Sequence, residues 1–212
     1  MHTIDLTHTI KALMPVFPGT EPPSFVSANT IEQDGFAETL LSFYSHTGTH
    51  MDAPAHIIYN APSLDSFPAS HFTGTAMVID CRNASATIGM DIINSAGPDV
   101  MQAEFLLFFT GWSAKWGSPD YFEGFPCIDA DVADYVVSSG KKGIGIDAIS
   151  VDPIADVNLP IHRLLLTSGK TVIVENLTNL DKVGNKLFTF YALPLKFDGA
   201  DGAPVRAIAI LA

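Results

Sequence analysis

Four side chains that can bind a metal ion or transfer a proton fall within eleven residues of this sequence: His46, His50, Asp52 and His56. Side chains on an extended strand alternate between its two faces, so four even-numbered positions would all point the same way. Pro54 opposes a helix, because it lacks a backbone donor and pushes the preceding residue toward extended geometry. We therefore predict a strand that breaks into tight turns at Gly48 and Pro54, with imidazoles and a carboxylate converging.

The residue types in this stretch indicate a divalent metal site. Imidazole nitrogens and carboxylate oxygens are ligands of zinc and manganese, so His46, His50 and Asp52 are predicted metal ligands. His56 follows Pro54, where the chain has turned, and is either a fourth ligand or a general base. An imidazole with a pKa of about 6.5 suits proton transfer at neutral pH.

Three residues outside the stretch are further candidates. Glu175 ends the apolar run 172–174, so its carboxylate should be desolvated and needs a cation or hydrogen-bond donors. A metal would satisfy it. His162 lies near the start of a predicted helix, where a surface or capping role is the alternative to metal binding. Phe17 lies between two prolines and is either a core residue or one wall of a substrate pocket.

The elements that must position these residues are mostly strands, which predicts an α/β fold with a mixed, strand-rich sheet as its core. The run 104–110 is apolar throughout, as expected of a strand buried on both faces. Residues 24–45 read as two strands around the turn Asp34-Gly35. The other predicted elements are strands at 4–7, 76–80, 143–147, 171–175, 188–194 and 205–211 and helices at 90–95, 130–138 and 160–168.

Length and composition limit the classes of protein. At 212 residues the chain is expected to form one domain, residues 1–212. Charged residues make up 16% of the chain, below the roughly 25% of an average domain, which favours a homo-oligomer, a dimer or a tetramer. The net charge of −12 argues against nucleic-acid partners, and the sequence has no basic cluster that would favour an anionic membrane.

The N-terminal sequence, the apolar runs and the cysteines bear on the cellular compartment. No signal peptide and no apolar run long enough for a membrane span is visible, so we expect a cytoplasmic protein. Cys81 and Cys127 share no metal-like or redox spacing and are expected to be reduced.

The stretch His46-Thr-Gly-Thr-His50-Met-Asp52-Ala-Pro-Ala-His56 resembles the signature of the cyclase family of metal-dependent hydrolases, which includes kynurenine formamidases and isatin hydrolases. The resemblance covers nearly the whole chain. It continues through weaker motifs in the family's order: Thr110-Gly111-Trp112, Gly145-Ile146-Asp147, Ser150-Val151-Asp152-Pro153, His162 to Leu166, Glu175-Asn176-Leu177 and Leu193-Pro194-Leu195.

The resemblance implies a role for each candidate. His46, His50 and Asp52 match ligands of a first metal, Asp52 and Glu175 match carboxylates that can bridge to a second, and His162 matches the second metal's remaining protein ligand. His56 matches the catalytic proton donor and acceptor. Phe17 stands where kynurenine formamidases have a tryptophan that contacts the substrate, a departure that leaves an aromatic ring in place.

The resemblance also implies a swivelling β/β/α architecture, a homo-oligomer and one or two zinc or manganese ions per subunit. The expected activity is hydrolysis of a small amide, a formamide such as an N-formylkynurenine, or a cyclic amide such as isatin, by a metal-activated water. Two alternatives stay open: a metal-dependent cyclase or dehydratase acting on a small carbonyl compound, and a non-catalytic metal-binding protein.

Overall fold

The computed structural model describes residues 1–211 and contains one large sheet of mixed direction. Over those residues the sheet has eight strands in the order β1-β12-β11-β5-β7-β9-β10-β4. Strand β12 also pairs with β4, so the sheet closes on itself like a barrel. The strands are β1 (His2–Asp5), β4 (His50–Asp52), β5 (Thr73–Asp80), β7 (Phe105–Phe109), β9 (Gly143–Ile146), β10 (Val172–Glu175), β11 (Phe188–Pro194) and β12 (Gly202–Leu211).

The short strand β4 closes the barrel and brings distant parts of the chain together. It runs antiparallel to β10 on one side and to β12 on the other. In this register His50 lies opposite both Glu175 and Pro204. A residue from the middle of the chain is thereby placed beside residues near its end.

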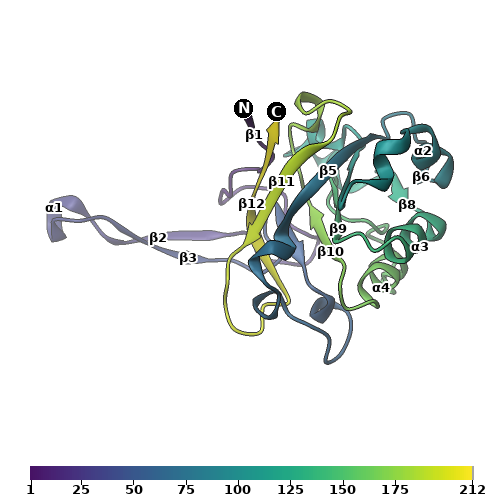
Figure 1. Ribbon diagram of the computed structural model, residues 1–212. Helices are drawn as coiled ribbons and strands as arrows, with labels where there is room; N and C mark the ends of the chain where they lie inside the picture. The colour runs from purple at the N-terminus through teal and green to yellow at the C-terminus, as the bar shows by residue number, and fades with distance from the viewer. Residues whose placement is uncertain (212) are drawn as a thin grey trace.

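Helices cover one face of the sheet. Helices α2 (Met90–Ser95), α3 (Ala130–Ser138) and α4 (Pro160–Leu166) lie together beyond β5, β7 and β9, on the right of Figure 1. Helix α3 begins where the Asp129 side chain accepts a hydrogen bond from the backbone of Val132. Near these helices, β6 (Thr87–Ile88) pairs with β8 (Cys127–Ile128) in a separate parallel pair.

The core has two parts, one on each face of the sheet. Leu106 and Phe108 pack into a cluster with the helices, whereas Phe105 and Leu107 pack into a second cluster with residues of β4, β10, β11 and β12. Alternate residues of β7 thus serve opposite faces. This confirms the prediction that this strand is buried on both sides.

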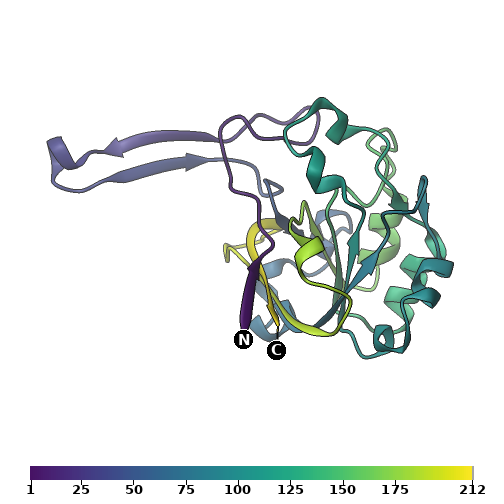
Figure 2. The same cartoon turned by 90° about the horizontal axis from the view of Figure 1, so that it is seen from above.

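Strands β2 (Ser24–Asn29) and β3 (Glu38–Ser42) form a separate antiparallel ribbon with the one-turn helix α1 (Ile31–Asp34) at its tip. Figures 1 and 2 show this ribbon projecting far from the rest of the molecule. We call residues 24–42 the arm and the remainder the body.

Most predicted elements are present, with shifted ends. The mixed α/β fold, the helices near 90–95, 130–138 and 160–166 and the strands of the second half are confirmed. The strand predicted at 4–7 lies at His2–Asp5, and the last strand begins at Gly202 rather than 205. Both cysteines are free. Within residues 1–211, no helix is long and apolar enough to cross a membrane.

Candidate metal centre

Strand β4 and the turn before it place the first three predicted ligands. His50 and Asp52 lie on β4, as alternation predicts, but His46 does not lie on a strand. The chain turns at Gly48, whose φ of 66° lies in the left-handed region that glycine adopts readily. The single-strand prediction is therefore wrong for His46, which reaches the cluster through the predicted turn.

The approach of His46 depends on a glycine in β12. A Cβ atom added to Gly202 would lie 2.4 Å from Cε1 of His46. The imidazole thus packs directly on the backbone at the start of β12. A side chain at this position would push the ring out of the cluster.

Asp52 is the centre of the first group of candidate ligands. Its Oδ1 lies 2.7 Å from Nδ1 of His46 and 3.3 Å from Nε2 of His50. These are distances between groups that could share one metal ion. The structure brings the three residues together as the spacing suggested.

A second group shares Asp52 and draws its other members from distant elements. Nε2 of His162, in the first turn of α4, lies 3.3 Å from Oε1 of Glu175 and 3.6 Å from Oδ2 of Asp52. His162, Glu175 and Asp52 are all buried. Asp52 thus offers one oxygen to each group, the arrangement of a bridging carboxylate.

The far nitrogen of each histidine has its own partner. His50 donates from Nδ1 to the carbonyl of Gly48 at 2.8 Å, and His162 donates from Nδ1 to Oδ2 of Asp152 at 2.7 Å. Such bonds fix the ring orientation and tautomer of a metal-binding histidine. Asp152, which lies in one of the weaker motifs, also accepts the backbone N–H groups of Ile161 and His162 at the start of α4.

The charges of the histidines and of the carboxylates in this cluster stabilise each other. Burial opposes the charge of His46, but Asp52 and Asp201 outweigh it and raise its pKa to about 10. Burial likewise opposes the charge of His162, yet hydrogen bonding to Asp152 and the acids beside it raise its pKa well above the usual value. The pKa of Asp52 is lowered against the effect of burial by the charges of His50 and His46. The carboxylates of the cluster therefore stabilise a positive charge placed between them.

These residues fit a divalent metal. Oδ2 of Asp52 is buried and, within residues 1–211, has no hydrogen-bond partner. An unpaired buried carboxylate oxygen is costly, and a cation would satisfy it. The donors are imidazole nitrogens and carboxylate oxygens, the set that suits zinc or manganese.

His56 lies beside these two groups and belongs to a third, in which its ligand atom comes within reach of those of His46 and Asp201. It ends the 3₁₀ turn Pro54–His56, and its ring centroid lies 3.9 Å from that of His46 and 6.1 Å from that of His162. Burial is the main cause that lowers its pKa to about 4. A neutral imidazole next to the cluster can accept a proton.

A cavity of about 350 Å³ opens onto the cluster. Its polar end carries all six predicted polar site residues: His46, His50, Asp52, His56, His162 and Glu175. Its apolar walls include Phe17, Tyr44, Ile149 and Leu159. The structure thus places Phe17 in the cavity rather than in the core, with 38% of its surface exposed. A flat aromatic molecule suits such walls.

Two of the weaker motifs form one buried support near the site. Asp147, directly after β9, accepts hydrogen bonds from the backbone N–H of Thr110 at 2.7 Å, from the hydroxyl of Thr110 at 2.6 Å and from the backbone N–H of Gly111 at 2.9 Å. The carboxylate is fully buried, and burial is the main cause that raises its pKa. Asp147 therefore fixes the loop that follows β7 rather than taking part in the chemistry.

Sequence reasoning missed Asp201, which lies just before β12. Its Oδ2 accepts a hydrogen bond from Nε2 of His46 at 3.2 Å and lies 4.0 Å from Nδ1 of His56. The hydrogen bond from His46 is the first cause that lowers the pKa of Asp201 to about 2. In the sequence, Asp201 is recognisable only as an acidic residue directly before Gly202, the first residue of β12. Such a pattern is too common to indicate a functional residue.

Asp201→Asn is expected to weaken metal binding roughly 10- to 100-fold, because a carboxylate that orients a metal-binding histidine has about that effect. Calorimetric titration of metal-free protein with Zn²⁺ or Mn²⁺ measures it. Asp198→Asn removes the same charge from an exposed position nearby and should bind metal as the unaltered protein does. Equal affinities for both variants would contradict a role for Asp201.

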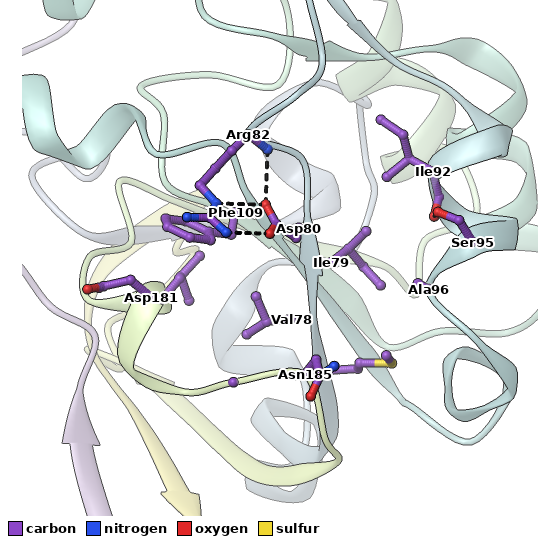
Figure 3. A pocket seen from close by; sticks show the side chains of 13 residues that line it. Val78, Ile79, Asp80, Arg82, Ile92, Ser95, Ala96, Phe109, Asp181 and Asn185 are labelled. Carbon is purple, nitrogen blue, oxygen red and sulfur yellow. Dashed lines mark hydrogen bonds and ion pairs between the residues drawn. The ribbon is translucent and has the colours of Figure 1, made fainter.

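A second cavity, of about 400 Å³, lies elsewhere in the body (Figure 3). Its lining includes Asp80 at the end of β5, Arg82 and Phe109. Arg82 donates to Asp80 from Nε at 2.9 Å and from Nη2 at 2.6 Å, and its guanidinium lies 5.0 Å from the centroid of the Phe109 ring. The charges of this pair compensate each other, so the metal-binding cluster remains the stronger candidate site.

Comparisons with known proteins agree with the geometry. A family model described as putative cyclase matches residues 4–153. A kynurenine formamidase of Salinibacter ruber is 32% identical over 98% of this chain and 97% of its own length. The similarity therefore extends beyond the matched region to both ends of the chain.

Solved structures show the same fold. Isatin hydrolase A from Labrenzia aggregata superposes with a TM-score of 0.87 at 24% identity, covering 98% of this chain and 93% of that one. A predicted metal-dependent hydrolase from Bacillus stearothermophilus superposes with a TM-score of 0.80 at 27% identity, covering 98% and 97%. At such identities the likeness establishes the architecture.

Proposed function

The chain belongs to the putative cyclase family, and we propose that it is a metal-dependent hydrolase that cleaves the C–N bond of a small amide. The proposal rests on the two groups of candidate ligands that share Asp52. Both groups lie at the polar end of a cavity with apolar walls. The proposed ligands are His46, His50 and Asp52 for one ion and Asp52, His162 and Glu175 for a second. Zinc and manganese both suit these donors.

The bound cation would supply Lewis acidity, which polarises a carbonyl group and acidifies water. His56 carries the proton in this proposal. Its Nδ1 faces Asp201 at 4.0 Å, which leaves Nε2 to take a proton from the attacking water and return it to the departing nitrogen. The lowered pKa keeps the ring unprotonated at neutral pH, so its free nitrogen is available to accept a proton.

The cavity walls suggest the class of substrate. Phe17 and Tyr44 offer aromatic surface within a volume of about 350 Å³, so we propose an aryl formamide or an aromatic cyclic amide. The relatives' names point the same way, since one is a kynurenine formamidase and another an isatin hydrolase. A cyclase or dehydratase reaction would need the same acid and base, but neither of these two relatives is named for it.

The test is a metal-dependent assay. Protein stripped with a chelator and reloaded with Zn²⁺ or with Mn²⁺ should hydrolyse N-formylkynurenine or isatin, and the stripped protein should hydrolyse neither. Metal analysis of the reloaded protein gives the number of ions per chain. Metal-loaded protein that hydrolyses neither compound would contradict the proposed substrate class. Binding without turnover of any amide would favour a non-catalytic metal protein.

A further inference from the structure

The backbone carbonyl of Gly48, which orients His50, accepts a second hydrogen bond. Nδ2 of Asn176 donates to this oxygen at 2.9 Å, and Nδ1 of His50 donates to it at 2.8 Å. The backbone carbonyl of Asn176 also accepts the hydroxyl of Thr49 at 2.6 Å. Asn176 therefore fixes the turn before β4 at two points. It follows directly after Glu175, the candidate ligand that ends the neighbouring strand β10.

The amide of Asn176 has one orientation in this arrangement. A carbonyl oxygen only accepts hydrogen bonds, so the amide nitrogen must face Gly48 and the amide oxygen is left for another donor. That donor is the hydroxyl of Tyr121, at 2.7 Å. Asn176 and Tyr121 are both buried, where such hydrogen bonds are stronger than in water. Tyr121 thus sets the direction of the amide, and the amide fixes the carbonyl that orients His50.

The position of Tyr121 depends on the loop after β7. Nε1 of Trp112 donates to the backbone carbonyl of Tyr121 at 3.0 Å. The Tyr121 ring packs edge-on against Trp116, with ring centroids 5.1 Å apart. The carboxylate of Asp147 fixes the start of the same loop. The buried support at Asp147 is therefore connected to the metal centre through Tyr121.

We propose that Asn176 and Tyr121 are positioning residues for the metal centre. Asn176 hydrogen-bonds the carbonyl of Gly48 that orients His50, and Tyr121 hydrogen-bonds the amide of Asn176. Both act through His50, so the inference rests on the proposed function, in which His50 binds a metal ion. The hydrogen-bond partners of a metal-binding histidine fix its ring and contribute roughly 10- to 100-fold to metal affinity. Loss of either residue should therefore weaken binding of the ion that His50 holds.

Two single variants test the two residues. Asn176→Gly removes the amide and keeps a residue that readily adopts the positive φ of this position, 57°. Tyr121→Phe removes the hydroxyl and keeps the ring that packs on Trp116. In calorimetric titration of metal-free protein with Zn²⁺, Asn176→Gly should weaken binding roughly 10- to 100-fold. Tyr121→Phe should weaken it by about 10-fold, because its hydroxyl lies one hydrogen bond further from His50. Unaltered affinity in either variant would overturn the proposal.

The double variant distinguishes one connected path from two separate effects. Because Tyr121 acts only through Asn176, adding Tyr121→Phe to Asn176→Gly should weaken Zn²⁺ binding no further. Losses that multiply in the double variant would overturn the proposal, since the two residues would then act independently.

Lys141→Met is the control for a general loss of stability. Lys141 is buried before β9, whereas the cavity residue Ile149 lies beyond the end of that strand. Its Nζ donates to the carbonyls of Val100 and Ala103 at 2.7 and 2.6 Å. Loss of these bonds should lower the melting temperature and leave both the Zn²⁺ affinity and the visible absorption spectrum of Co²⁺-loaded protein unaltered. Asn176→Gly should shift that spectrum. An equal loss of Zn²⁺ affinity in Lys141→Met would overturn the proposal.

Failure of this inference can be told from failure of the proposed function. Unaltered protein that binds no metal would overturn both. Zn²⁺ affinity that is the same in the unaltered protein, in Asn176→Gly and in Tyr121→Phe would overturn this inference alone. None of these measurements uses an amide, so a failed assay for amide hydrolysis leaves the inference unaffected.

Discussion

Protein in which Asp52 is replaced by alanine is expected to bind neither metal ion and to hydrolyse no amide. Asp52 offers Oδ1 to the group with His46 and His50 and Oδ2 to the group with His162 and Glu175. Its removal therefore takes one ligand from each group at once. Removing a carboxylate that only hydrogen-bonds a metal ligand lowers metal affinity roughly 10- to 100-fold. Removing a ligand shared by two ions should therefore lower metal affinity more than about 100-fold.

Metal analysis after dialysis, followed by calorimetric titration, would measure this loss. Asp80→Ala is the matched control, because it removes an aspartate from another strand end, at the second cavity. It should leave metal content and turnover unchanged. The bridging arrangement would be wrong if Asp52→Ala still bound either ion with unaltered affinity.

His56→Ala is expected to retain the metal and lose most turnover. A positioned general base contributes about 10²- to 10⁴-fold, so kcat should fall by that factor. KM should change little, because Phe17 and Tyr44 still line the cavity. The contrast with Asp52→Ala would separate the proposed proton carrier from the residues proposed to hold an ion.

Two measurements on one preparation check this prediction: metal content and steady-state kinetics. His2→Ala, at the exposed start of the chain, serves as the control and should match the unaltered protein. A His56 variant that lost its metal but kept its activity would reverse the assigned role.

The sequence was most informative where chemistry and spacing coincide. Three candidate ligands within seven residues stood out because few structural roles require such a set, and Glu175 stood out because a carboxylate at the end of an apolar run needs a partner. The two-sided burial of β7 followed from its unbroken apolar run. These inferences depend on local pattern, which the folded chain preserves.

Other features depend on contacts that no local pattern encodes. His46 does not lie on the expected strand, because the chain turns at Gly48 and the absence of a side chain at Gly202 leaves room for the imidazole ring. Gly202 lies on a strand far from His46 in the sequence. Asp201 was missed for the same reason, since its role comes from lying beside His46. The arm reads as an ordinary hairpin in the sequence. Its separation from the body appears only once the sheet is assembled.

The closure of the barrel by β4 has a consequence for the order in which the protein matures. Thr49 bonds to Asn176, 127 positions away, and His46 to Asp201, 155 positions away. Contacts of such long sequence separation form slowly and late in folding. A chain emerging from the ribosome would carry the first three candidate ligands well before Glu175 and β12 exist to frame them. The candidate metal centre would be complete only after the last strand is made, so we expect metal loading to follow synthesis rather than guide it.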